Sequence, residues 1–568
     1  MPKFPPENGS FSGQGGGGGL SRRSFLGSAA GLGALAALSP ISATRASAAA
    51  RSVGLPSANQ VWDWQHQLVG FGTRYTGGPG HVRFVDWIAA QLAQVPGFQL
   101  RRDRHTFGRW LAQDWSMSIS QPTTVGASGP VPLAYYYPYS GQTPTQGVTG
   151  KLVDLGAYPA AVIGTSGTGY APEFWLPARG GVALVRAGPS TYSPSSTTTA
   201  LGGYEQGKTS QQAVLDYQSA GALQTNPAFA GIFSPVGLAD AKAAGVQAVV
   251  VAYTGMADDE VANQYNPFIT PYPSASGLPT PGDNGCPAVW VGDATGQALS
   301  RSARTGAATV TVKLTADITS GAATDTVWGF LPGSQPGARP LIVNTHTDGP
   351  NAAEENGALG MIALAQYFAN RPHARDIYFA FVTGHFQLPQ FTQPVPTPRP
   401  EVGSDATSVW MADHPSIYQS AVAGLTVEHL GCTQWLGDPI TNQYFATGQY
   451  EWGVTYTCQR TASTSPTNTE QDAWLNAINA VAATGRPVGP VAAVQPTPLY
   501  LGEGAPLYAG GLGTVSLVPL PTYLLQAGSR QHPAMLDLEK LDKQLAYSQI
   551  LAFARTLVTL DATPDNAF

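Results

Sequence analysis

The chain has little charge and little cysteine. Only 11% of its 568 residues are Asp, Glu, Lys or Arg while 43% are apolar, which excludes a disordered chain and predicts large buried cores. The net charge of −6 offers no basic surface, so no nucleic-acid partner is expected. Three widely separated cysteines argue against a cysteine-based metal site. Cys432 and Cys458 could pair outside the cell, or all three thiols could remain reduced.

Long hydrophobic runs are also absent after residue 50, so we expect no membrane span in the mature chain. The N-terminus differs from the rest. Ser21–Leu26 reads Ser-Arg-Arg-Ser-Phe-Leu, an Ala/Gly/Leu run follows, and Ala46–Ala48 is a small-x-small cleavage site. This pattern predicts a signal peptide over residues 1–48 that engages the twin-arginine export machinery. The mature protein is therefore expected to be secreted or periplasmic.

The length predicts more than one domain. Two amphipathic helices are expected before residue 100, at Val61–Leu68 and His81–Leu92. Between residues 116 and 320 the sequence pattern changes to short β-rich segments that are separated by Ser, Thr, Gly and Pro. Beyond them strand and helix patterns alternate up to a long helix at Leu541–Leu560, which is typical of a mostly parallel sheet covered by helices.

The segment Leu341–Gly349 carries the strongest chemical signal. Apolar and β-prone residues run into His346, and Asp348 follows two positions later. A buried strand that ends in His-x-Asp holds an imidazole at the carboxyl edge of a sheet, beside a carboxylate that can orient the ring. Glu354 and Glu355 then precede an apolar helix. These residues together predict half of a metal site.

Several segments resemble, in the right order, the secreted zinc peptidases of the di-zinc aminopeptidase and glutamate carboxypeptidase type. The segments are Phe71–Gly78 (the opening Gly-x-Arg loop), Val327–Gly333 with the His346 strand, Glu503–Val515 (the late acidic loop and strand) and Asp537–Asp542 (the C-terminal signature). In addition, Ala241–Gly245 and Pro287–Val291 resemble the protease-associated domain that is often inserted in this family.

The resemblance covers residues 55 to 560 and implies a fold and a domain plan. The expected fold class is α/β: a three-layer α/β/α arrangement in which a mostly parallel or mixed sheet lies between helices. Residues 49–115 would form the N-terminal part of the peptidase domain, 116–320 an inserted β-rich protease-associated-like domain, and 321–568 the catalytic domain.

The resemblance also implies site residues. The family uses a His, a bridging Asp, a Glu-Glu pair, a second Asp and a late His around two zinc ions. His346 matches the first ligand and Asp348 its orienting partner. The bridging acid falls at Glu354 or Glu355, with Glu355 favoured because Asn-Gly follows it. Two further metal ligands match Glu428 and His532.

The Glu-Glu pair is replaced by His385 and Phe386. Phe cannot coordinate a cation, so the site is expected to hold one zinc, or two with an incomplete ligand set. His385 is a candidate proton acceptor in place of the glutamate, since an imidazole titrates near neutral pH. His429 follows Glu428 and would point away from it on a regular strand, so packing or capping is the simpler role, although it could also assist the metal.

Three functions remain open from the sequence. The leading hypothesis is an exported zinc peptidase that acts on exposed N-termini or short peptides. A second is a hydrolase of another amide, such as an N-acyl amino acid. The third is an inactive peptidase-fold protein that binds extracellular ligands, because a shared fold transfers function poorly.

Overall fold

The computed structural model describes residues 54–158, 172–188, 198–221, 237–265, 285–395, 399, 405–461, 463–496 and 499–568. The predicted signal, residues 1–48, lies outside these ranges. Among the described helices, none combines the length and the apolar character that crossing a membrane requires.

The peptidase-like part is built on a mixed sheet. Its strand order is β9-β11-β10-β12-β17-β15-β16-β6, and β11, β10, β12 and β17 run parallel. The bounds are β9 Thr309–Leu331, β10 Leu341–His346, β11 Ile377–Val382, β12 Ala423–Val427, β15 Gly453–Cys458, β16 Val491–Pro496, β17 Gly513–Leu517 and β6 Thr198–Tyr204. The central strands are continuous runs of buried residues, as strands covered on both faces require.

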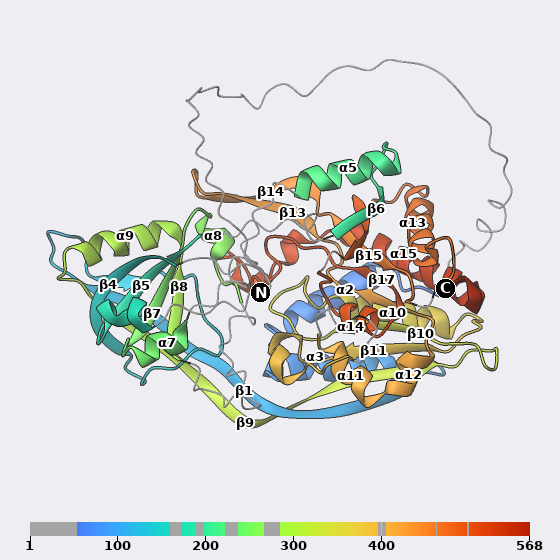
Figure 1. Cartoon of the computed structure of the whole chain (residues 1–568), viewed down its shortest axis with the longest axis horizontal. Coiled ribbons are helices and arrows are strands. Elements are labelled where there is room, and N and C mark those ends of the chain that lie inside the picture. The colour runs from blue at the N-terminus through green and yellow to red at the C-terminus, as the bar shows by residue number, and fades with distance from the viewer. Residues whose placement is uncertain are drawn as a thin grey trace, which may run out of the picture. The chain divides into compact units, whose positions relative to one another are not determined.

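Helices cover both faces of this sheet (Figure 1). One face packs against α2 (Ala58–Gly70), α3 (Pro79–Leu92), α10 (Gly357–Ala369), α13 (Thr469–Ala482) and α15 (Lys543–Ala562). The other packs against α11 (Thr407–Asp413), α12 (Pro415–Ser420) and α14 (Ala505–Ala509). This arrangement confirms the expected α/β fold with a mixed sheet between helices.

A second group of strands forms its own parallel core. It contains β4 (Val148–Tyr158), β5 (Val182–Ala187), β7 (Ala248–Tyr253) and β8 (Ala288–Val291), with α7 (Leu238–Ala243) and α9 (Asp293–Arg304). The long antiparallel pair of β1 (Gln99–Ser120) and β9 runs from this core into the peptidase-like sheet (Figure 1). The sequence predicted only short β-rich segments up to residue 320, whereas β9 runs without interruption from Thr309 to Leu331.

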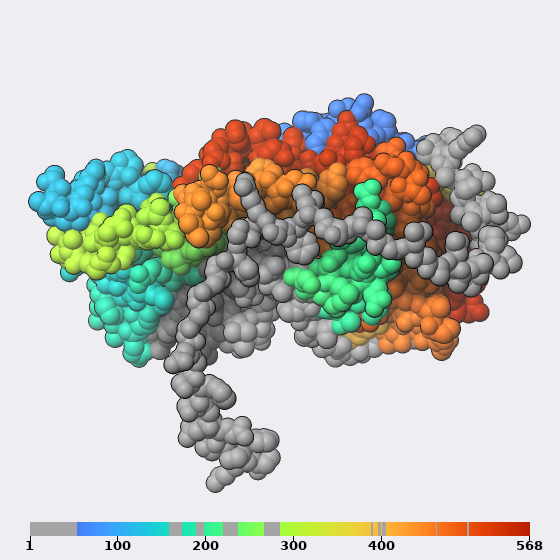
Figure 2. Space-filling model, turned by 90° about the horizontal axis from the view of Figure 1, so that it is seen from above, coloured from blue at the N-terminus to red at the C-terminus, as the bar shows by residue number. Residues whose placement is uncertain are grey.

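One element from the middle of the chain belongs to the larger sheet. Strand β6 pairs with β16 at its edge, and α5 (Ser210–Gly221) packs on both strands. Figure 2 shows α5 in green on the surface beside orange C-terminal segments. The stretch predicted as one inserted domain, residues 116–320, therefore also contributes to the peptidase-like part.

Candidate metal centre

His346 ends β10, at the carboxyl edge of the sheet, and its side chain is fully buried. Its Nδ1 lies 2.8 Å from the main-chain oxygen of Asp348. Within the described residues, its Nε2 has no hydrogen-bond partner. Burial and the nearby imidazoles hold the pKa of His346 well below its usual range, so the ring is neutral. The sequence predicted that the carboxylate of Asp348 orients this ring, but the orienting atom is the main-chain oxygen.

The carboxylate of Asp348 holds the loop after β11 instead. It accepts main-chain N–H bonds from Gly384 and His385, both at 3.2 Å, and from Phe386 at 2.8 Å. Gly384 has a φ of 103°, a conformation that favours glycine. Asp348 therefore links the His346 strand to the loop that carries His385.

His385 lies against His346 with its ring stacked. Its Nδ1 is 2.7 Å from Oε1 of Glu503 and 3.3 Å from Oδ1 of Asp405, while its Nε2 is 3.8 Å from Oε1 of Glu354. Burial lowers the pKa of His385, but the charge and hydrogen bond of Asp405, together with Glu503, outweigh it and raise the pKa well above its usual range. The carboxylates of Glu503 and Asp405 thus hold the Nδ1 side of the His385 ring.

His429 also faces Glu354, with its Nε2 3.3 Å from Oε2. Its Nδ1 lies 2.7 Å from the main-chain oxygen of Pro519. The expectation that His429 points away from the site is wrong, since its φ of 52° lies in the left-handed region, where side-chain alternation along a strand no longer holds. Burial opposes protonation of His429, but Glu354 raises its pKa above the usual value.

Three imidazoles thus share one arrangement: an oxygen contacts each Nδ1, and Glu354 lies on the other side. Two groups of side chains bring their ligand atoms within 4.8 Å of one another in the described part of the chain: His346, Glu354 and His429, and His385, Asp405 and Glu503. Metal-binding histidines usually have their second nitrogen held by a carboxylate or carbonyl in this way. Two imidazoles and a carboxylate, with His346 Nε2 unpartnered, fit a zinc ion.

Glu355, the favoured bridging residue, is in neither group. It forms a fully buried ion pair with Arg74, whose guanidinium also donates to the main-chain oxygen of Asn351. Burial lowers the pKa of Arg74 to about 9. The Asn351 Oδ1 accepts the N–H of Glu354 at 3.0 Å, which sets the turn. Of the two adjacent acids, Glu355 therefore neutralises an arginine, and Glu354 faces the histidines.

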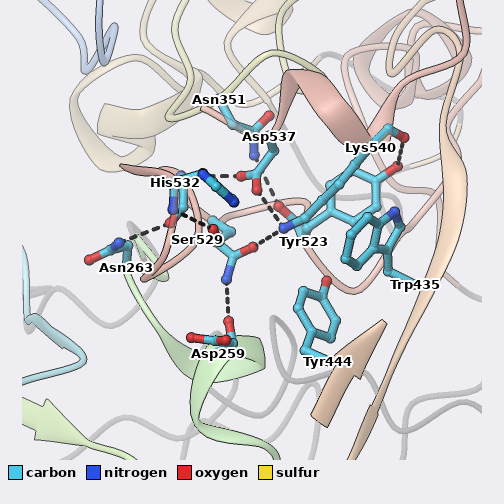
Figure 3. Close-up of polar contacts among 12 residues, drawn as sticks. Asp259, Asn263, Asn351, Trp435, Tyr444, Tyr523, Ser529, His532, Asp537 and Lys540 are labelled. Atoms are coloured by element: carbon cyan, nitrogen blue, oxygen red, sulfur yellow. Dashed lines mark hydrogen bonds and ion pairs between the residues drawn. The ribbon is translucent and has the colours of Figure 1, made fainter. Parts of the chain in front are cut away.

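Two other predicted ligands also lie in neither group. Glu428 is buried, its Oε1 accepts the Glu503 N–H at 2.8 Å, and burial raises its pKa to about 8. His532 is exposed on the loop before a short 3-10 helix, with its N–H donating to Ser529 (Figure 3). Leu536, between His532 and the C-terminal signature, adopts a left-handed φ of 44°.

A buried lysine supports the loop from Pro519 to Gln526, which contacts His429 through Pro519. Figure 3 shows Lys540 between Asp537 and neighbouring aromatic rings. Lys540 is fully buried, lies 2.5 Å from Oδ1 of Asp537 and donates to Oε1 of Gln526. Its Nζ lies 4.8 Å from the ring centre of Tyr444 and 5.1 Å from that of Tyr523. The main-chain oxygens of Tyr523 and Leu524 accept from the Asn351 side chain, at 3.0 and 2.7 Å. This loop therefore contacts both the Glu354 turn and, through Pro519, His429.

The cysteines do not pair. Cys286, Cys432 and Cys458 are all free and buried. Cys432 donates to the main-chain oxygen of His429 at 3.2 Å, and burial raises the pKa of all three thiols.

No family model matches the chain, and no curated protein matches it in sequence. Solved structures match its fold. The zinc aminopeptidase BSAP from Bacillus subtilis aligns over 89% of this chain and 95% of its own, with 14% identity and a TM-score of 0.53. A peptidase M28 precursor from Shewanella amazonensis SB2B aligns over 89% and 98%, with 14% identity and a TM-score of 0.51. The fold is therefore that of zinc aminopeptidases of the M28 type, as expected.

Proposed function

We propose that the protein is an exported, zinc-dependent peptidase whose single metal is held by His346, Glu354 and His429. The observation that carries the proposal is the common orientation of three imidazoles around Glu354, with oxygens at their Nδ1 atoms. Two histidines and one glutamate form the protein ligand set of several mononuclear zinc peptidases. One ion, rather than two, suits a chain that has Phe386 at the position of the second metal's ligand.

When bound, zinc supplies Lewis acidity toward the amide carbonyl and makes water more acidic. In the chain itself, His385 is the proposed proton acceptor, since its Nε2 lies on the side of Glu354. Asp405 and Glu503 raise the pKa of the ring, and the positive charge of a zinc ion held by His346 and Glu354 would lower it again, so that the neutral ring can accept a proton from water. Glu503 and Asp405 position it by holding Nδ1. The same ring would then pass the proton to the departing amine, so that water adds across the peptide bond and an acid and an amine are released.

Peptides are the proposed substrates because the matched folds are zinc aminopeptidases. The twin-arginine pattern at Ser21–Leu26 supports export and a secreted or periplasmic location. Glu428, which accepts from the Glu503 main chain, is proposed to support that loop rather than to bind the metal.

The test combines metal analysis with turnover of aminoacyl amides and short peptides. Purified protein should hold about one equivalent of zinc and lose activity to a chelator. Glu503→Gln should retain zinc but lower kcat about 100-fold, because His385 loses the carboxylate that holds its Nδ1 and with it most of its contribution as a general base. Protein that binds no zinc and cleaves none of the substrates would instead be a binding protein, and the proposal would be abandoned.

A further inference from the structure

A surface pocket lies in the smaller parallel core, away from the residues proposed above. Its volume is about 330 Å³. The lining comes from β4 (Lys151 to Asp154), the turn before β5 (Arg179 to Gly181) and the end of α9 (Ala303 and Arg304). These three segments thus meet around one hollow, and Figure 1 shows α9 beside β4 and β5.

The lining of the pocket contains three positively charged residues, although the net charge of the whole chain is −6. Lys151, Arg179 and Arg304 are exposed, and none of them forms an ion pair with another described residue. Arg304 stands in the last turn of α9, where a cation also suits the helix dipole. That preference does not account for Lys151 or Arg179, which lie outside any α-helix.

The one acidic residue in the lining, Asp154, is already engaged. Its Oδ1 accepts the Gly156 N–H at 2.9 Å and lies 3.8 Å from the Arg186 guanidinium, and its Oδ2 accepts the Ser300 hydroxyl. The charge of Asp154 is therefore partly neutralised by Arg186. The lining contains no other carboxylate to neutralise Lys151, Arg179 and Arg304.

Parts of the pocket are held in place. The Arg304 Nη1 donates to the Ser300 hydroxyl at 3.1 Å, so the guanidinium is tied to the same serine that binds Asp154. The Arg179 side chain lies over Gly245, where a Cβ would meet its Cγ at 3.4 Å. Leu152, Val153, Pro177 and Ala303 complete the lining and give the pocket an apolar side.

We propose that this pocket binds a doubly charged oxyanion, namely phosphate or the phosphate group of a small monoester. Two guanidinium groups can each present paired N–H donors to such a group, and an ammonium adds a third charge. The apolar side would accommodate the organic part of an ester. The site is independent of the proposed zinc centre, because it shares no residue with it.

Calorimetric titration of the purified protein with inorganic phosphate, phenyl phosphate and acetate tests the proposal. Phosphate should bind more tightly than the monoanion acetate, and its affinity should fall with added salt. The variant combining Arg179→Gln and Arg304→Gln should bind phosphate at least tenfold more weakly than the wild type. Lys151→Gln should also weaken phosphate binding, but by a smaller factor. Arg101→Gln, an exposed cation on β1 outside the pocket, is the matched control and should not change the affinity.

Tighter binding of phenyl phosphate than of phosphate would identify a monoester as the ligand, and equal binding would identify free phosphate. The wild-type affinity should persist in His346→Ala, which excludes the zinc centre as the binding site. The proposal is overturned if phosphate does not bind, or if it binds the double variant, folded as judged by its melting curve, as tightly as the wild type.

Discussion

The rings of His346 and His385 stack with their centroids 4.2 Å apart and their planes within 17°. The sheet brings them together because β10 and β11 are parallel neighbours whose register pairs His346 with Val382, just ahead of the His385 loop. Asp348 then holds that loop through three N–H groups. A proposed metal ligand and a proposed proton acceptor thus lie side by side through contacts made at one sheet edge.

Glu354 and His532 allow a direct comparison between a ligand that the geometry favours and one that the sequence predicted. Glu354→Gln should abolish tight zinc binding, because an amide oxygen replaces a carboxylate facing His346 and His429. Exposed His532→Ala should retain about one equivalent of zinc. Metal content after dialysis against a weak chelator measures both. If Glu354→Gln retains zinc, or if His532→Ala loses it, the proposed ligand set is wrong, and the residues expected from the sequence, Glu355 and His532, become the better candidates.

Glu355→Gln should act on stability rather than on the metal. Removing one member of a buried ion pair leaves the Arg74 charge without its partner, which costs about 3 to 5 kcal/mol. Chemical denaturation should show this loss, and the double variant with Arg74→Met should recover part of it. If Glu355→Gln unfolds like the wild type but has lost zinc, Glu355 is a ligand after all.

The fold was predictable from the sequence because its signals are local. The apolar run that ends at His346 and the amphipathic helix at His81–Leu92 appear where periodicity indicated them. The choice between Glu354 and Glu355 was not predictable, because it depends on Arg74, about 280 positions away in sequence, in a loop that reaches the acidic turn.

Two other residues were misjudged, and for His429 the reason is its backbone conformation. His429 joins the site because it adopts a positive φ just after β12, and no glycine or asparagine marks that position in the sequence. His532 matched the late histidine by its order in the chain, but it is exposed. Glu503 was visible as part of the late acidic loop, yet its contact with His385 is a long-range one that no spacing rule reveals.

Lys540→Met should weaken zinc binding without touching a proposed ligand. Lys540 contacts Gln526 and the Tyr523 ring, and the loop they belong to orients His429 through Pro519. Loss of a direct hydrogen-bond partner of a ligand typically lowers metal affinity 10- to 100-fold, so this more distant change should stay near or below the lower end of that range. Because the variant also leaves Asp537 buried without its cation, zinc affinity is compared at a temperature where the melting curve shows folded protein. Lys543→Met, which removes a half-buried lysine contacting Asn59, is the control, and equal affinities in the two variants would contradict the expected role of Lys540.

Glu470 predicts a pH dependence of stability that is separate from the site. It lies buried in the first turn of α13, and burial raises its pKa to about 7 from the usual value of 4.5. Between these two values the folded state binds the proton and the unfolded state does not, so this group lowers the free energy of unfolding as the pH rises. The loss is complete above pH 7 and amounts to about 3 kcal/mol for a shift of this size.

Glu470→Gln removes the titrating group while retaining a polar side chain. The variant should match the wild type near pH 4 and become more stable by up to about 3 kcal/mol at pH 8, measured by urea denaturation across this range. Asp472→Asn, an exposed acid in the same turn of α13, is the matched control and should give a curve parallel to that of the wild type. If the Glu470→Gln and wild-type curves also run parallel from pH 4 to pH 8, the carboxyl group binds protons equally in the folded and unfolded protein, and burial has not raised its pKa.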